Sequence, residues 1–273
     1  MKTSDFLAQH PVFTTEDIRD FQQARGSHSQ WTRKALLAHY QKQQRIIRIR
    51  RGVYAAVPPG GGGEGTTPDD LAVDPYLVAS KLAPDAVLGY HTALAAHGRA
   101  HSASQRFEFL TSTGGRGIRF QEWRFQPVLF AHVLRRKKKT TWGVQQLERS
   151  GQALAVTALE RTLVDVLERP DLGGGWEEIW RSLESVEFFN LDQIIEYALL
   201  LENATTIAKV GFYLEQHRET LMVEEAHLAA LRPHRPANPH YLERGKKADV
   251  KFISGWNLVV PLAVAERSWE IVL

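Results

Sequence analysis

The chain has 273 residues, of which 43% are hydrophobic and 24% charged, a composition typical of a soluble globular protein. It contains no cysteine, which excludes disulfides, thiolate metal ligands and a cysteine nucleophile. The polar N-terminus does not resemble a signal peptide, and the apolar stretch 256–265 is far shorter than the ~20 residues of a membrane helix. We therefore expect a cytoplasmic protein of about two domains that makes no membrane contact.

Positive charge is concentrated at the N-terminal end of the chain. Residues 1–58 contain ten Lys or Arg residues and four acidic residues, a net charge of +6, whereas the remaining residues carry −3. Such asymmetry favours an anionic partner for the basic segment. From charge alone, a solvated basic face is an equally good interpretation.

The N-terminal segment has the pattern of three helices followed by a β-hairpin. Thr14 or Thr15 can cap the second helix, whose first turn carries acidic residues as the helix dipole favours. The third helix is expected from about residue 30 to residue 43. Residues 45–50 end in alternating Arg and Ile, which predicts a half-exposed strand, and a tight turn and second strand follow at residues 51–57.

A segment rich in Pro and Gly marks the clearest boundary in the chain. Four consecutive glycines, residues 60–63, cannot hold a regular element, and the flanking prolines interrupt helix and sheet alike. We therefore expect a flexible linker at residues 59–68 between an N-terminal domain, 1–58, and a larger C-terminal domain, 69–273.

The C-terminal domain has a mixed pattern without the regular alternation of a doubly wound sheet. Helices are expected at residues 74–82, 91–97, 157–168, 176–183, 191–201 and 207–218. Strands are expected at residues 107–111, 125–133, 250–253 and 257–260. The predicted fold class is α+β, with an N-terminal winged helix-turn-helix followed by a larger mixed α/β domain.

Three short helices beside a basic hairpin suit the surface of duplex DNA. The second helix of a helix-turn-helix enters the major groove, and its first residues reach base edges. The early polar residues of that helix in this chain are Ser29, Gln30, Arg33 and Lys34. The hairpin residues that would contact phosphates are Arg48, Arg50 and Arg51. The alternative is a protein-interaction module whose basic edge contacts an acidic protein.

Several motifs, in order along the chain, resemble the AbiEi family of type IV toxin–antitoxin antitoxins. The hairpin resembles that family's wing, with the sequence RIIRIRRGVY at residues 45–54. Further similar segments are DPYLVAS at 74–80, PDAVLGYHTALAAHG at 84–98, LERTLVD at 159–165 with the glycines 173–175, residues 203–212, and WNLVVP at 256–261. The resemblance thus extends over nearly the whole chain.

This resemblance implies a DNA-binding repressor. Such antitoxins bind repeats in the promoter of their own operon, which also encodes a nucleotidyltransferase-like toxin. Binding to repeats would allow the protein to self-associate on DNA. The resemblance also implies that the antitoxin counteracts the toxin without direct contact. Relatives that have no toxin gene imply the alternative of a stand-alone transcriptional regulator.

The densest run of charge in the chain contains five consecutive basic residues. They are Arg135, Arg136, Lys137, Lys138 and Lys139. In a DNA-binding protein such a run can form a second phosphate-binding patch, because neutralised phosphates give affinity without sequence preference. The alternative is an ordinary solvated loop.

Two other groups of polar residues favour structural roles. Glu160 and Arg161 lie in an apolar helix, and we expect their charges to pair with each other or to face solvent. His91, His97 and His101 fall close together, but no acidic residue is spaced to complete a metal site. We therefore predict no bound metal.

No enzyme class fits the sequence well. A nucleotidyltransferase needs Gly-Ser followed by paired acids, and no acid follows Gly26-Ser27 before Glu64. A magnesium-dependent nuclease could use Asp249 and Lys251 with an upstream carboxylate, Glu224 or Glu225, but that tripeptide is common by chance. We therefore expect no catalytic residues and no cofactor, with a nuclease as the weakest alternative.

Overall fold

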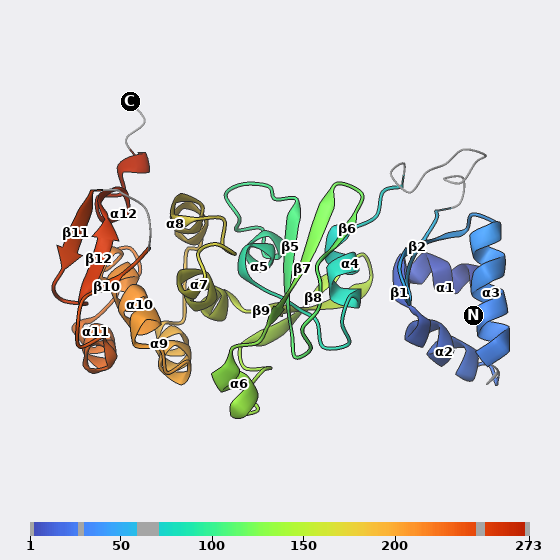
Figure 1. Cartoon of the computed structure of the whole chain (residues 1–273), viewed down its shortest axis with the longest axis horizontal. Coiled ribbons are helices and arrows are strands. Elements are labelled where there is room, and N and C mark those ends of the chain that lie inside the picture. The colour runs from blue at the N-terminus through green and yellow to red at the C-terminus, as the bar shows by residue number, and fades with distance from the viewer. Residues whose placement is uncertain (1–2, 27–29, 59–70, 244–248, 271–273) are drawn as a thin grey trace. The chain divides into compact units, whose positions relative to one another are not determined.

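The chain forms two compact units of mixed α and β structure. The computed structural model describes residues 3–26, 30–58, 71–243 and 249–270 (Figure 1). The first unit comprises Met1–Leu88, Gln105–Val128 and Gln146–Val156, and the second comprises Gly89–Ser104, Leu129–Gln145 and Thr157–Leu273. The predicted linker at residues 59–68 lies outside the described residues. No helix in the described part of the chain is both long and apolar enough to cross a membrane.

The N-terminal residues form the three expected helices and hairpin, together with a short strand that was not expected. The elements are α1 (Thr3–Gln9), β1 (Val12–Thr14), α2 (Thr15–Gln23), α3 (Gln30–Lys42), β2 (Ile46–Arg50) and β3 (Val53–Ala56). β3 lies between β1 and β2 and pairs antiparallel with both. Buried aromatic and aliphatic side chains from all three helices and from the sheet share one core, which includes Phe6, Phe13, Ile18, Leu37 and Tyr54.

Local sequence explains where these elements begin and turn. The Thr14 hydroxyl accepts hydrogen bonds from the amides of Glu16 and Asp17, and the Asp17 carboxylate accepts one from the Thr14 amide at 2.7 Å, which completes a capping box. Gly52 has φ +86 at the hairpin turn, a left-handed conformation that costs glycine little. Thr14 and Gly52 are therefore the residues that fix the start of α2 and the reversal of the hairpin.

The first unit also contains a six-stranded sheet in the order β6-β7-β5-β4-β9-β8. Its strands are β4 (Val87–Leu88), β5 (Arg106–Thr111), β6 (Ile118–Phe120), β7 (Trp123–Leu129), β8 (Val144–Arg149) and β9 (Gln152–Thr157). α4 (Pro75–Lys81) begins with proline after the Asp74 cap, and its Tyr76 ring meets Phe107 of β5 edge-on at 5.2 Å. This contact packs α4 on the face of the sheet that carries Phe107.

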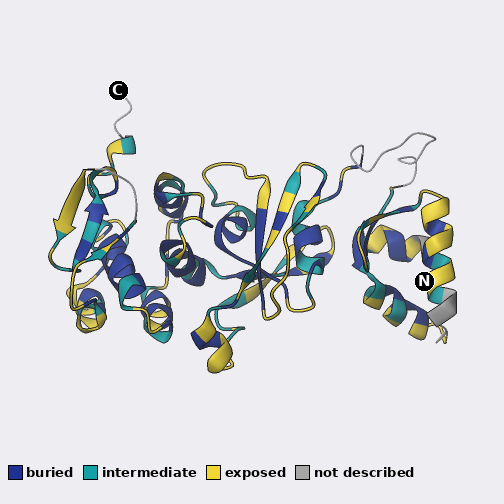
Figure 2. Cartoon of the chain, viewed as in Figure 1, coloured by how far each residue is buried: buried dark blue, intermediate teal, exposed yellow. Residues whose placement is uncertain are grey.

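The second unit is mainly helical, with buried faces turned inward on each long helix (Figure 2). Its helices are α5 (Tyr90–Ala96), α6 (His132–Arg136), α7 (Leu159–Glu168), α8 (Trp176–Glu184), α9 (Leu191–Leu200), α10 (Ala204–Gln216) and α11 (Glu225–Leu231). Among them, α7 contacts α5, α8, α9 and α10.

A small sheet follows the helices, in the order β10-β12-β11, from β10 (His240–Tyr241), β11 (Val250–Ile253) and β12 (Leu258–Pro261). The chain then continues into α12 (Leu262–Ala265) and a 3-10 turn at Ser268–Glu270. A Cβ at Gly211 would lie 2.2 Å from the ring of Trp256, so only glycine allows α10 this close to the indole.

Most of the predicted helices of the C-terminal part are confirmed, with shifts of a few residues at their ends. Two predicted boundaries are wrong. The strand expected at 125–133 ends at Leu129, because the chain turns into α6. The helix expected from Thr157 begins at Leu159, because residues 152–157 form β9.

Candidate nucleic-acid interface

The first turns of α3 carry the residues predicted to reach DNA bases. Ser29 lies outside the described residues, and Gln30 is the first residue of α3. Arg33 is half-buried, and its Nε donates a hydrogen bond to Oε1 of Gln22 in α2 at 3.4 Å. Lys34 is exposed. The bond from Arg33 therefore links the two helices that a helix-turn-helix would use.

The hairpin β2–β3 presents its arginines to solvent. Ile46 is buried, and exposure then alternates along β2 so that Arg48 and Arg50 are exposed, as the sequence predicts. The pairing of β2 with β3 is irregular between Arg48 and Arg50, and the exposed Arg51 follows at the turn. Irregular pairing increases local twist and re-aims the side chains at the end of a hairpin.

Arg50 also contacts the protein's own backbone. Its Nη2 donates a hydrogen bond to the carbonyl of Leu82, which follows α4 in the same unit. One donor of this guanidinium is thereby used inside the protein. Arg48 and Arg51 make no ion pair with any acid in the described part of the chain, so their charges are the more available ones.

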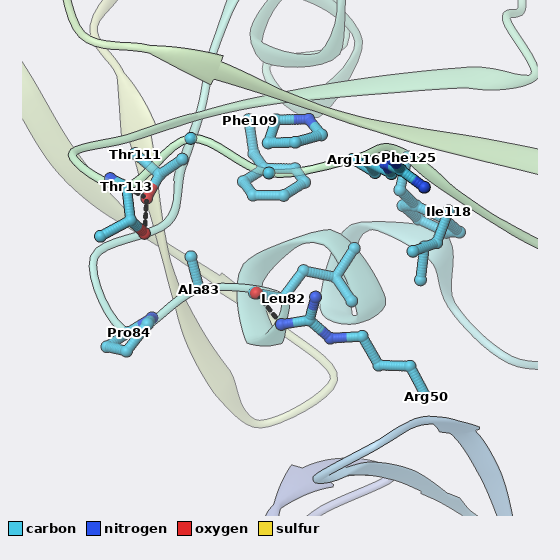
Figure 3. Close-up of a pocket in the computed structure, with 13 residues that line it drawn as sticks. Arg50, Leu82, Ala83, Pro84, Phe109, Thr111, Thr113, Arg116, Ile118 and Phe125 are labelled. Atoms are coloured by element: carbon cyan, nitrogen blue, oxygen red, sulfur yellow. Dashed lines mark hydrogen bonds between the residues drawn. The ribbon is translucent and has the colours of Figure 1, made fainter.

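A pocket of about 230 Å³ adjoins Arg50 (Figure 3). The loop between β5 and β6 contributes Thr113 and Arg116 to its lining, and Thr111 comes from the end of β5. The Thr111 hydroxyl donates to the carboxylate of Asp85 at 2.6 Å. This pocket was not predicted from the sequence. Its signal is the glycine-rich stretch at residues 114–117, which follows a strand and includes an arginine.

The basic run at the C-terminal end of α6, residues 135–139, belongs to the second unit and is partly neutralised. All five side chains from Arg135 to Lys139 are exposed. Arg136 and Lys137 both pair with Glu202, at 2.5 and 2.6 Å, and their hydrogen bonds lower the pKa of that carboxyl. Among the described acids none pairs with Lys138 or Lys139. Two of the five cations thus have a carboxylate partner.

The expectation for Glu160 and Arg161 is wrong in its details. The two side chains do not pair with each other, and Arg161 is only 1% exposed. Its Nε donates to Asp165 at 3.3 Å, and its Nη1 donates to the carbonyls of Thr140 and Trp142. Glu160 instead accepts a hydrogen bond from the amide of Asn190 at 3.1 Å. The arginine is buried because one acid a helical turn away and two carbonyls satisfy it.

Asp165 also accepts a hydrogen bond from a tyrosine of α9. The Tyr197 hydroxyl donates to Oδ1 of Asp165 at 2.7 Å, and the Tyr197 ring stacks on Trp142 at 4.7 Å. Burial raises the pKa of Asp165, while the charge of Arg161 and the bond from Tyr197 oppose that rise. The group is a satisfied internal ion pair rather than a solvent-accessible site.

His91 and His101 share Glu178 as a partner, whereas His97 contacts a backbone carbonyl. His91 Nε2 lies 3.1 Å from Oε1 of Glu178, and His97 Nε2 lies 2.8 Å from the carbonyl of Thr157. The His101 amide donates to Glu178 at 3.0 Å. Within the described residues, no group of three or more His, Asp or Glu side chains could hold a metal ion.

Of the residues considered for a nuclease, Glu225 and Lys251 have other charged partners. Glu225 pairs with Arg218 and Arg232, and the Glu224 amide is bonded to His227 at the start of α11. Lys251 lies 4.0 Å from Glu266.

Comparison with known proteins gives a relationship in fold alone. No protein-family model matches the chain, and no curated protein matches it in sequence. The structure is similar to the crystal structure of the RV2827C protein from Mycobacterium tuberculosis, with a TM-score of 0.57 and 16% sequence identity. The match covers 97% of this chain and 92% of that one. The shared architecture therefore spans both units.

Proposed function

We propose that this chain is a DNA-binding transcriptional repressor that acts through its N-terminal residues. In this proposal α1, α2 and α3 with the sheet β1-β3-β2 form a winged helix-turn-helix. α3 is the recognition helix, and the hairpin β2–β3 is the wing. The observation that carries the proposal is the pair of exposed arginines, Arg48 and Arg51, at the end of a hairpin that shares a core with α3.

In this proposal α3 and the hairpin have different roles: residues of α3 read bases, and the hairpin contacts phosphates. This division of labour follows from the positions of their basic residues. A side chain on the first turns of α3, such as Arg33, can enter the major groove and bond a guanine edge in a bidentate manner. The hairpin arginines can contact phosphates, which position the protein without selecting a sequence. Basic residues that follow α6, chiefly Lys138 and Lys139, would add a further phosphate contact from the second unit.

We further propose that the repressor is an antitoxin of the AbiEi type, on the strength of the motifs found in order along the chain. Its DNA partner is then a set of promoter repeats of its own operon. It counteracts a nucleotidyltransferase-like toxin without binding it. A regulator without a toxin partner is the competing function, and a nucleotidyltransferase-like gene adjacent to this one would separate the two.

A gel-shift titration with the DNA upstream of the gene tests the proposal. Arg33→Ala should reduce preference at one base position by about 1–3 kcal/mol, because one base contact is lost. Arg48→Ala should weaken binding to all duplexes alike, because a phosphate contact carries no sequence information. Wild-type protein that shows no sequence-specific shift at moderate salt would refute the repressor function, and equal losses on every duplex for both variants would refute the division of labour.

A further inference from the structure

Three arginines gather on one face of the six-stranded sheet, at the end formed by β5, β6 and β7. Arg119 of β6 lies directly opposite Arg124 of β7 in the antiparallel register, and both are exposed. The Arg124 amide donates to the carbonyl of Gln105 at 2.8 Å, which places Arg106 of β5 beside them. We call Arg106, Arg119 and Arg124 the arginine face.

The alternation of the strands fixes the direction of these side chains. Ile118, Phe120, Trp123 and Phe125 occupy the other face of β6 and β7 and are buried or half-buried. Phe107 stacks on Phe125 at 5.6 Å and so belongs to that apolar face, which puts its neighbour Arg106 on the arginine face. The arginines are thus held on a sheet that is anchored by an aromatic cluster on its other side.

This arrangement is unfavourable for the protein alone. Like charges directly opposite each other in an antiparallel pair are destabilising. Arg106 has a partner in the buried Glu108 at 3.3 Å, but no described acid forms an ion pair with Arg119 or Arg124. Two adjacent strands therefore keep an uncompensated positive pair at exposed positions.

The chemistry of the surface favours phosphates over a protein partner. Protein interfaces are enriched in Arg, but they combine it with an apolar and aromatic centre. The exposed large hydrophobic residue of β7, Leu129, alternates onto the apolar side of the strand and not onto the arginine face. Guanidinium groups bind phosphate oxygens in a bidentate manner, and the neighbouring strands that carry them lie about 4.8 Å apart.

The arginine face is separate from the pocket beside Arg50, whose lining includes Ile118 and Phe125 of the apolar face. The loop that leads into β6 carries Arg116, which is exposed and lines the same pocket as Arg50 of the hairpin (Figure 3). We propose that the arginine face is a second contact for the phosphate backbone of the DNA duplex, independent of base sequence. This inference rests on the proposed function, because it extends the footprint of the same repressor.

The test measures how the affinity of the full chain for a labelled duplex of unrelated sequence depends on salt. Arg119→Gln/Arg124→Gln should make the slope of log K against log salt shallower by about 2, since each lost phosphate contact removes about 0.9. Arg119→Lys/Arg124→Lys should retain most of the wild-type slope, because the charges remain. The control is Arg218→Gln/Lys251→Gln, which changes the net charge by the same amount at two exposed cations of the second unit that have acidic partners, and it should leave the slope unchanged.

The outcomes separate this inference from the proposal on which it rests. A wild-type slope in Arg119→Gln/Arg124→Gln would overturn the arginine face as a DNA contact and leave the repressor function standing. An equal loss in the control variant would overturn it as well, because net charge alone would then explain the effect. A wild-type chain that binds no duplex would overturn both.

Discussion

The guanidinium of Arg161 is neutralised inside the second unit by one carboxylate. Transfer of both charges out of water is expensive, and their attraction compensates only where hydrogen bonds satisfy the remaining donors. Here the carbonyls of Thr140 and Trp142 accept from Arg161, and Tyr197 donates to Asp165. The pair therefore ties the segment before β8 to α7 and α9.

Removal of the acid should be far more harmful than removal of the pair. Asp165→Ala leaves Arg161 buried without a counter-charge, and we expect a loss of about 3–5 kcal/mol in the free energy of unfolding. Arg161→Met/Asp165→Leu replaces both charges with apolar groups and should lose less than Asp165→Ala alone. Urea denaturation of the three proteins measures this. An Asp165→Ala protein as stable as wild type would contradict the account of the pair.

The spacing of Arg161 and Asp165 in the sequence indicates their ion pair but not its burial. Arg161 and Asp165 are four residues apart on a helix, the spacing at which opposite charges meet. The carbonyls that satisfy Arg161 come from a segment about 20 residues earlier in the chain. The helical periodicity of α7 is a local pattern, so the sequence was enough to predict the helix. The burial of the Arg161 side chain depends on carbonyl groups that are distant in the sequence, so the sequence did not predict it.

At the scale of elements, one acidic residue, Glu202, neutralises part of the positive charge at the end of α6. Glu202 follows α9 and bridges Arg136 and Lys137. Exposed ion pairs contribute about 0–1 kcal/mol to stability, so this bridge has little importance for folding. Its main effect is on the charge that α6 presents to an anionic partner.

Glu202→Gln should release both cations for binding. If α6 contacts phosphates, the variant should bind a duplex of unrelated sequence several-fold more tightly at low salt, with a slope steeper by up to about 2. Thermal unfolding should change little. Glu219→Gln, which removes an exposed acid elsewhere in the second unit, is the matched control, and an equal gain in affinity there would show that α6 has no special role.

The β8–β9 hairpin and the arginine face were not predicted from the sequence, for different reasons. The β8–β9 hairpin turns at Ser150 and Gly151, which have φ +50 and +73, the two left-handed residues of a type I′ turn. That Ser-Gly signal was present in the sequence, but the flanking strands lack a regular hydrophobic alternation. The arginine face had no local signal, because it depends on the register between β6 and β7 and on their pairing with β5.

At the scale of the whole molecule, the half-buried Glu168 and the buried Lys209 make stability depend on pH. Glu168 ends α7, and burial together with the nearby Asp165 raises its pKa to about 7. Lys209 of α10 donates to the carbonyl of Leu167 at 3.0 Å and lies over the ring of Trp176, and burial lowers its pKa to about 8. Both groups are therefore more easily neutral in the folded protein than in the unfolded chain.

The sign of the pH dependence follows from these pKa values. The pKa of Glu168 lies above its ordinary value of 4.5, so the folded state is favoured at low pH and loses stability as the pH rises from 4.5 to about 7. The pKa of Lys209 lies below its ordinary value of 10.5, so stability is lost as the pH falls from 10.5 to about 8. Both penalties are largely present between pH 7 and 8.

Glu168→Gln should remove the acid's share of that penalty. Each pKa unit corresponds to about 1.4 kcal/mol, and partial exposure of Glu168 reduces the effect, so we expect a gain of about 1–3 kcal/mol in the free energy of unfolding at pH 8. At pH 4 the gain should nearly vanish, because the wild-type carboxyl is then protonated in the folded protein. Urea denaturation at the two pH values measures the difference.

The control for this prediction is Glu187→Gln, which removes the same charge at an exposed position and should show no comparable gain at pH 8. A gain in Glu168→Gln of equal size at pH 4 and pH 8 would mean that shape or hydrogen bonding, and not the buried charge, limits stability at this position.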